Sequence, residues 1–430
     1  MTVSNSMLAS KLERRSWFFA AGFLLWVSLD FGYRFFVSKN YDYAGFAAEI
    51  SYAKYLEGVL IYLLVLFFSP NLLKVPSDYF VAFLVFGLIC PLLVFYGLAN
   101  QEREHLYIVL FGFFIVNFVR KGRIVKLFVL REGYWLAVSG VLLLTFLISL
   151  WFFVSGGVRY FNLDLTQVYE FRRGAGEIIN TGVMAYLNVW LYKVLGPSLL
   201  AIALWKGRFF LAVLVLFLHL YWFGVSAHKA VLFYPFLVVF LWFWFRRSRA
   251  LFIIPIAMSA LVISTLMLAI FVGFDFPASL FIRRAFFVIA NNVFDYYEFF
   301  SANEHVYWSN SVLSRFIEYP YDLNPADTIG RYRGTDSHVN NSFLSTGFMH
   351  AGIWGVVFYG VLAGLLFRLI DSFGAYGVPV WVAVAILIVP SRSLLLSADL
   401  PTALLTHGIG VGVLILFLLR RTRSERVGLK

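Results

Sequence analysis

The sequence has very little cysteine and little charge. Cys90 is the only cysteine in 430 residues and lies in an apolar run, which excludes a disulfide framework or a thiolate metal cluster within the chain. Charged residues make up 13% of the chain, about half the usual share for soluble proteins. Acidic residues are scarcer than basic ones, so the formal net charge is +12.

Several catalytic signatures are missing as well. Neither a Gly-rich phosphate loop nor an HExxH, GxSxG or CxxC motif occurs, so ATP-driven transport and the common hydrolytic classes have no support. The positive charge does not indicate nucleic-acid binding, because the Lys and Arg residues follow the connections between apolar stretches instead of gathering on one solvated patch. No internal repeat, low-complexity tract or appended soluble domain is visible.

Apolar residues dominate what is present. The chain is 61% hydrophobic and 20% aromatic, with a mean hydropathy of +0.82. Because roughly twenty apolar residues cross a bilayer as a helix, we expect a single all-α polytopic membrane domain over residues 1–430 with about twelve transmembrane helices. The expected spans are 17–36, 55–73, 79–98, 105–119, 135–154, 183–205, 208–226, 230–246, 251–273, 343–369, 376–391 and 402–419.

The distribution of Lys and Arg predicts the orientation. The stretch 17–36 is too long for a signal-peptide core and has no small-residue cleavage site, so we expect it to stay as the first helix. With the N-terminus inside, the inner segments hold twenty Lys and Arg residues against five Asp and Glu. Because cytoplasmic loops carry the excess of positive charge, both chain ends are expected in the cytoplasm of a bacterial inner-membrane protein.

Two outer connections are longer than a simple turn needs. They run from residue 155 to 181 and from residue 274 to 341, and the second is rich in Tyr, Trp, Phe and Asn. Long connections in compact proteins are usually functional or disordered, and these two lack a disordered composition. We expect them to face the periplasm and to contain short helices that pack over the outer mouth of the bundle.

The first long connection carries Arg172 and Arg173, followed by glycines. A guanidinium group offers a planar fork of donors that matches phosphate oxygens, and it keeps its charge. The alternative is that Glu170 simply pairs with Arg173 on an exposed turn, which contributes little.

The second long connection begins with Arg283 and Arg284, and the stretch up to Phe300 is expected to form one helix. Spacings of seven, four and three residues place a polar stripe on one face of that helix: Arg284, Asn291, Asp295 and Glu298. Apolar residues occupy the opposite side. The alternative is an ordinary solvated helix face.

A pair of cations on each of two outer loops has an economical explanation in a bound anion. Arg can stabilise a pyrophosphate leaving group without a metal, and a base would activate the acceptor hydroxyl. The candidates for the base are Glu298, Asp295, Glu170, Asp336 and His338. Lys229 either extends to the headgroups or adds a cation to the anion site. Glu57 and Lys193, inside expected spans, are candidates for the wall of a polar cavity.

Five segments along the chain resemble the Wzy-type O-antigen polymerases, also called oligosaccharide repeat unit polymerases. They occur in the following order: Tyr41-Asp42-Tyr43-Ala44-Gly45-Phe46, the Arg172-Arg173 loop, the His228-Lys229 turn, Arg283-Arg284 leading to Asp295-Tyr296-Tyr297-Glu298-Phe299-Phe300, and Asn340-Asn341-Ser342-Phe343-Leu344 leading to His350-Ala351-Gly352-Ile353-Trp354-Gly355. The order and spacing of all five make the match.

The resemblance implies a metal-independent glycosyltransferase of the bacterial inner membrane that needs no cofactor. It would move a growing glycan from undecaprenyl pyrophosphate onto a fresh lipid-linked repeat at the periplasmic face, in O-antigen, lipopolysaccharide or related polysaccharide biosynthesis. The expected partners are a flippase and a chain-length regulator, together with membrane lipid. The expected substrate-binding residues are Arg172, Arg173, Arg283, Arg284, Lys229, Tyr296, Tyr297 and Asn340.

Two alternatives remain open at this point. The related O-antigen ligases, which transfer finished polymer to the lipid A core, share this layout and use Arg and His for comparable work. A lipid-linked sugar flippase or transporter belongs to another class, in which charge is buried in a central cavity and two-fold repeats are common.

Overall fold

The structure is a computed structural model that describes residues 2–125, 127–164, 167–374 and 377–420. Within these residues the chain is helical, apart from turns and an isolated antiparallel bridge between Leu72 and Ala250. The longer α-helices of the first half are α1 (Thr2–Gly32), α3 (Tyr52–Phe68), α4 (Pro76–Leu84), α5 (Cys90–Leu98), α6 (Arg103–Val119), α7 (Gly133–Val154), α8 (Val168–Ile179), α9 (Met184–Trp190) and α10 (Gly196–Trp205).

The second half continues with α11 (Phe209–Ser226), α12 (Lys229–Phe245), α13 (Ile253–Met267), α15 (Val288–Ala302), α16 (Pro325–Tyr332), α17 (Phe343–Gly374), α18 (Val380–Leu396), α19 (Leu400–Leu404) and α20 (Ile409–Leu418). Short helical pieces complete the chain: α2 (Ser38–Asn40), α14 (Asp275–Ala278), the 3-10 turns η2 (Asp42–Ala44) and η4 (Gly157–Tyr160), and the π-helical turns η1 (Tyr33–Val37), η3 (Val85–Ile89), η5 (Leu191–Leu195), η6 (Leu268–Val272) and η7 (Ser279–Phe287).

Among the described residues, seven helical stretches are long and apolar enough to cross a membrane. They are Glu13–Asn40, Pro76–Leu98, Gly133–Val154, Met184–Trp205, Phe209–Ser226, Ile253–Val272 and Phe343–Phe373. Their outer surfaces are strongly apolar; in α7, for example, the most apolar window has a mean hydropathy of 2.4 but is only 28% buried. Because water does not tolerate so large an apolar surface, we conclude that this is a membrane-embedded all-α protein.

Helices occupy all twelve stretches for which the sequence predicts a span, but several ends differ. Helix α3, which corresponds to the expected span 55–73, ends at Phe68, and α18 covers 380–396 instead of 376–391. The expected helix at 402–419 is wrong: it divides into α19 and α20, and Gly408 between them has φ +84°. Since that left-handed conformation suits glycine and not other residues, the chain turns there.

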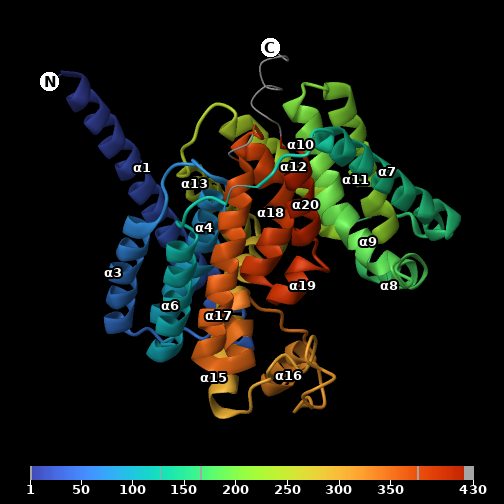
Figure 1. Cartoon of the computed structure of the whole chain (residues 1–430). Coiled ribbons are helices and arrows are strands. Elements are labelled where there is room, and N and C mark those ends of the chain that lie inside the picture. The colour runs from blue at the N-terminus through green and yellow to red at the C-terminus, as the bar shows by residue number, and fades with distance from the viewer. Residues whose placement is uncertain (1, 126, 165–166, 375–376, 421–430) are drawn as a thin grey trace.

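The connections gather at two opposite ends of the bundle. At the end that holds the N-terminus, Leu73 donates to the carbonyl of Arg249 over 2.7 Å, and Arg420 donates to that of Phe128 over 2.6 Å. We call this end the N-terminal face. The other end, which carries α8, α15 and α16 in Figure 1, we call the α16 face. There the indole of Trp190 donates to the carbonyl of Leu405 over 2.8 Å.

The centre of the bundle is formed by the α4–α5 rod and by α18. In the rod Pro76–Leu98, 94% of the apolar window is buried, and α18 is buried along almost its whole length. A helix surrounded by other helices can be apolar on every side, and both sequences have this composition. The exception within α18 is Arg392, which is exposed although residues 381–391 and 393–396 are buried.

The helix α17 is broken near the α16 face, where the sequence predicts one continuous helix. Ala351 (φ −155°, ψ 35°) and Gly352 (φ 56°, ψ −141°) leave the helical conformation. The break frees backbone carbonyls, and the preceding loop satisfies two of them: the N–H groups of Val306 and Tyr307 donate over 3.0 Å each to the carbonyls of Met349 and His350. Irregular backbone inside a membrane protein requires such protein partners.

Candidate functional site

The first predicted arginine pair lies on α8. Arg172 and Arg173 are both exposed, and together with Gly176 and Glu177 they line an open cavity of about 490 Å³. The helix α8 packs against η4 and α11. The side chain of Glu170 lies outside the described part of the structure. Two exposed guanidinium groups therefore border one cavity at the α16 face.

The second predicted pair lies on η7. Arg284 is exposed, whereas Arg283 is half-buried with its guanidinium carbon 4.0 Å from the ring centroid of Tyr41. The π-helical turn η7 packs against η1, α13 and α14. Figure 1 shows α15, which continues from η7, beneath α17, and α8 toward the right of the view. The two arginine pairs thus lie on separate elements, α8 and η7, and the expectation that all four arginines hold one pyrophosphate stays a prediction.

The aromatic pair predicted to contact the glycan is buried in the core. Tyr296 and Tyr297 are 2% and 0% exposed, and their hydroxyls donate to the carbonyls of Val339 and Leu344 over 2.8 and 3.4 Å. The ring of Tyr297 stacks on Phe348. Because both hydroxyls and both rings already have protein partners, we correct the prediction: these residues fix α15 to the start of α17.

The polar stripe expected on α15 is not one exposed face. Asn291 is buried, and Asp295 forms an ion pair with Arg333, the residue that ends α16. Burial lowers the pKa of Arg333 to about 10. The physical reason is that α16 covers this side of α15. Glu298 is exposed and hydrogen-bonds Tyr332, so it remains accessible to a substrate.

The polar cluster before α17 is exposed. His338 pairs with Asp327 at 2.6 Å, and its side chain is 56% exposed. A hydrogen bond from His338 lowers the pKa of Asp327. Asp336 and Asn340 are exposed as well. At the start of α12, the side-chain nitrogen of Lys229 lies 5.6 Å from the ring centroid of Phe276.

A different set of cations meets at the α16 face. Lys193, on η5, donates to the hydroxyl of Ser393 over 3.1 Å and to Nδ1 of His407 over 2.9 Å. Burial and the charge of Lys193 lower the pKa of His407 to about 4. The imidazole is therefore neutral at physiological pH and can accept the hydrogen bond. Arg392 precedes Ser393 on α18 and adds a second positive charge beside Lys193.

Two further basic side chains extend this group. His228 lies between α11 and α12, with its ring 6.1 Å from that of Tyr192. Burial, followed by the charges of Arg172 and Lys193, lowers the pKa of His228 to about 4. Arg172 thus lies close enough to add its field to that of Lys193. We call Arg172, Lys193, His228, Arg392 and His407 the Arg392 cluster.

The Arg392 cluster lacks compensating carboxylates. Among the described residues, no Asp or Glu forms an ion pair with Lys193 or Arg392. By contrast, Glu57, which was also expected within a span, forms an ion pair with Arg103 at 2.9 Å. Unpaired cations that are partly shielded from water are costly. An anionic ligand would remove this cost.

A second buried polar group lies at the break in α17. His350 is 0% exposed; its Nδ1 accepts from the backbone N–H of Trp308 over 3.1 Å, so Nε2 carries the proton and donates to Asp399 over 3.2 Å. Although burial raises the pKa of Asp399, hydrogen bonds from His350, Tyr359 and Thr346 lower it overall. Both ring nitrogens of His350 are engaged, so this network holds the break together and offers no free base.

Comparison with known proteins adds no relative to this picture. No protein-family model, curated protein or solved structure matches the chain. The function must therefore be argued from the geometry. Among the residues that the structure describes, no three His, Cys, Asp or Glu side chains gather in a way that could hold a metal ion.

Sequence reasoning missed Arg392, His407 and Asp399 as members of polar groups. A signal existed for His407, because a titratable residue inside an expected span marks a functional position. Arg392 lies one residue beyond the expected span 376–391, where a cation is ordinary. Lys193 was expected to line a polar cavity, and the structure places it beside His407 and Arg392.

Proposed function

We propose that this protein polymerises oligosaccharide repeats carried on undecaprenyl pyrophosphate. In this proposal the chain crosses the bacterial inner membrane twelve times, both ends are cytoplasmic, and the α16 face is periplasmic. The proposal is supported by seven helical stretches that are long and apolar enough to cross a membrane. It is also supported by the excess of Lys and Arg in the short connections that the sequence assigns to the side of the N-terminus. A flippase and a chain-length regulator are the proposed partners.

The observation that carries the proposal is the Arg392 cluster. Arg392 lies near Lys193, and Arg172 and Lys193 both lie near His228. These three cations come from three separate helices, and among the described residues none of them forms an ion pair with a carboxylate. A pyrophosphate supplies the missing negative charge, and its isoprenoid tail can remain in the surrounding lipid. The open cavity bordered by Arg172 and Arg173 provides space for the sugars outside the bundle.

The proposed reaction is a glycosyl transfer without a metal. The bond between the anomeric carbon and the pyrophosphate oxygen breaks, the acceptor hydroxyl oxygen bonds to that carbon, and undecaprenyl pyrophosphate leaves. Arg172, Lys193 and Arg392 stabilise the negative charge that develops on the leaving oxygen. The acceptor proton passes to a carboxylate, and Glu298 is a candidate because its side chain is exposed.

The test is polymer formation by the purified full chain from one synthetic lipid-linked repeat. Arg392→Gln should lower the rate of chain extension by about 100-fold, the usual cost of losing one preorganised donor to a developing charge. Arg315→Gln, which removes an exposed arginine from the same face, is the matched control and should retain activity. Equal polymer yields from wild type and Arg392→Gln would refute the site.

The same assay separates the alternatives. A ligase would transfer glycan to a lipid A core acceptor but would not lengthen the repeat, and a transporter would leave the repeat unchanged in detergent solution. Addition of EDTA should leave the polymer yield unchanged, and a requirement for added metal ions would contradict the proposed mechanism.

A further inference from the structure

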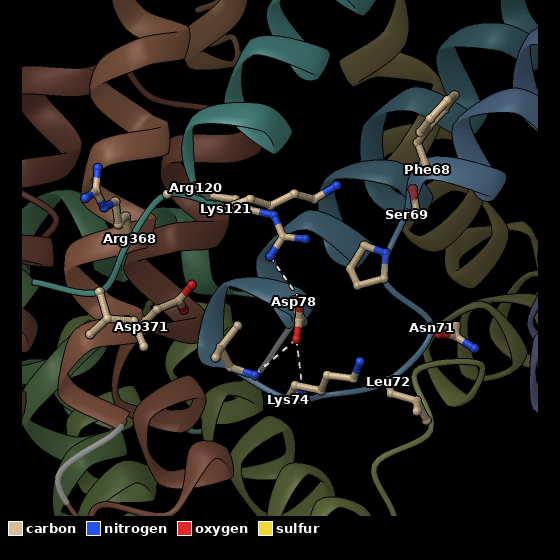
Figure 2. A pocket seen from close by; sticks show the side chains of 14 residues that line it. Phe68, Ser69, Asn71, Leu72, Lys74, Asp78, Arg120, Lys121, Arg368 and Asp371 are labelled. Atoms are coloured by element: carbon tan, nitrogen blue, oxygen red, sulfur yellow. Dashed lines mark hydrogen bonds and ion pairs between the residues drawn. The ribbon is translucent and has the colours of Figure 1, made fainter. Parts of the chain in front are cut away.

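A second basic site lies at the opposite end of the bundle. A cavity of about 420 Å³ opens at the N-terminal face between the end of α3, the start of α4, the end of α6 and the end of α17. Figure 2 shows its charged lining residues, which are Lys74, Asp78, Arg120, Lys121, Arg368 and Asp371. We call it the Lys74 cavity.

The inner wall of the Lys74 cavity is fixed by internal bonds. Arg120 and Asp78 form a buried ion pair at 2.9 Å, with side chains 5% and 9% exposed. Asp78 also accepts from the backbone N–H groups of Lys74 and Val75. Asp371 accepts from the N–H of Ser77 over 2.8 Å and from its hydroxyl over 2.6 Å. Both carboxylates are therefore occupied.

The outer cations have no such partners. Among the described residues, no carboxylate pairs with Lys74, Lys121 or Arg368, and Arg368 uses only its Nε, on the carbonyl of Arg123. In Figure 2 the side chains of Lys121 and Lys74 lie on either side of Asp78. Partial burial and the nearby charge of Arg120 lower the pKa of Lys121. An anion between the side chains of Lys74 and Lys121 would offset the repulsion between the positive charges of Lys121 and Arg120.

The rim of the cavity is apolar where it meets the outside of the bundle. Phe68 and Ile124 line the cavity and are 47% and 49% exposed, and Phe67 and Phe118 beside them are 64% and 81% exposed. Exposed rings and aliphatic chains at the end of membrane-spanning helices face lipid. An occupant of this site therefore has to be charged at one end and apolar at the other.

We propose that the Lys74 cavity binds the phosphate headgroup of an anionic phospholipid from the leaflet at the N-terminal face. Lys74, Lys121 and Arg368 contact the phosphodiester, while the acyl chains lie along Phe68 and Phe118. Basic pockets between helix ends are suited to anionic headgroups because low-dielectric surroundings screen the ion pairs less than water does. This site is separate from the Arg392 cluster and stands whether or not the protein is a polymerase.

The experiment uses the purified full chain in a neutral detergent and short-chain dioctanoyl lipids. Dioctanoyl phosphatidylglycerol is expected to bind about tenfold more tightly than dioctanoyl phosphatidylcholine or inorganic phosphate. In the double variant Lys74→Gln/Lys121→Gln, the affinity for phosphatidylglycerol should fall by about tenfold. The matched control is Arg14→Gln/Arg131→Gln, which removes two exposed cations from the same face outside the cavity and should bind like wild type.

Three results would overturn the proposal: equal affinity in the double variant and wild type, equal affinity for both lipids, or binding of inorganic phosphate as tight as that of phosphatidylglycerol. The last would mean a site for a soluble anion. A second measurement needs no variant. In vesicles that contain phosphatidylglycerol, Lys74 and Lys121 should react more slowly with an amine reagent than in pure phosphatidylcholine, whereas the reactivity of Lys39 should stay unchanged.

Discussion

The two basic regions of this protein, the Lys74 cavity and the Arg392 cluster, differ in the partner of their most buried cation. In the Lys74 cavity the most deeply buried cation, Arg120, is paired with Asp78, and the unpaired cations lie outside that pair. In the Arg392 cluster the most buried cation, Lys193, has only a hydroxyl and a neutral imidazole for partners. A buried ion pair thus joins α4 to α6, whereas a cation without a carboxylate partner is what we propose as a position for a ligand.

The largest expected effect is on stability at the Lys74 cavity. Asp78→Asn leaves Arg120 buried without its counter-charge, and such a change costs about 3–5 kcal/mol of unfolding free energy. Thermal unfolding in detergent measures it, with Asp336→Asn on the exposed loop as the control. A melting temperature equal to that of wild type would show that the pair does not hold α4 against α6, and the contrast between the two regions would fail.

The second prediction removes a cation of the Arg392 cluster instead of the partner of one. Lys193→Met removes a cation that has no carboxylate partner, so the free energy of unfolding should change by about 1 kcal/mol at most. Polymer formation should nevertheless fall by about 100-fold, because one of the cations proposed to bind the leaving group is lost. The two readouts are measured on one preparation. Loss of stability without loss of activity would reverse the assignment of the two regions.

A third prediction concerns α17, which runs from the break at Gly352 to the Lys74 cavity. Gly352→Ala places a side chain in a backbone conformation that suits glycine, with the added carbon 3.1 Å from Nε2 of His305. The expected cost is about 1–3 kcal/mol of stability. Lipid affinity at the Lys74 cavity should remain that of wild type, because the break is at the other end of the helix. A parallel loss of lipid affinity would show that the regions are mechanically coupled.

The smallest effect is on the pH dependence of stability. The pKa of His407 is about 4 in the folded protein, below its ordinary value of about 6.5. Its contribution is therefore complete above pH 6.5 and is lost as the pH falls toward 4, at about 1 kcal/mol between pH 6.5 and 5.5. His407→Gln, which keeps an acceptor for Lys193, should reduce this dependence in thermal unfolding measured across that range. An unchanged slope would contradict a buried neutral imidazole.

Most of the helices could be predicted from the long apolar runs in the sequence. Twenty-residue apolar stretches specify helices by themselves, so the existence of the helices could be predicted from composition. The end of α3 could not, because the chain between residues 69 and 75 is held by a bridge to Ala250, a contact with a distant segment. The break at Gly352 was also hidden, because glycine is common in intact membrane helices.

The candidate site was harder to predict because it also depends on contacts between segments that are distant in the sequence. A helical period shows which residues of α15 share a face, but it does not show that α16 covers Asp295 or that Tyr296 reaches the carbonyl of Val339. The contacts of Lys193 with Ser393 and His407 span 200 and 214 residues of sequence. No local pattern carries such information.

The break in α17 also has a consequence for the order of assembly during synthesis. The N–H groups of Val306 and Tyr307, which satisfy the carbonyls freed at Met349 and His350, belong to a loop that leaves the ribosome before α17. A cap is thus already translated when the broken helix enters the lipid. Asp399, which accepts a hydrogen bond from His350, follows 49 residues later. The break can therefore close in two stages, and the second must wait for the insertion of α18.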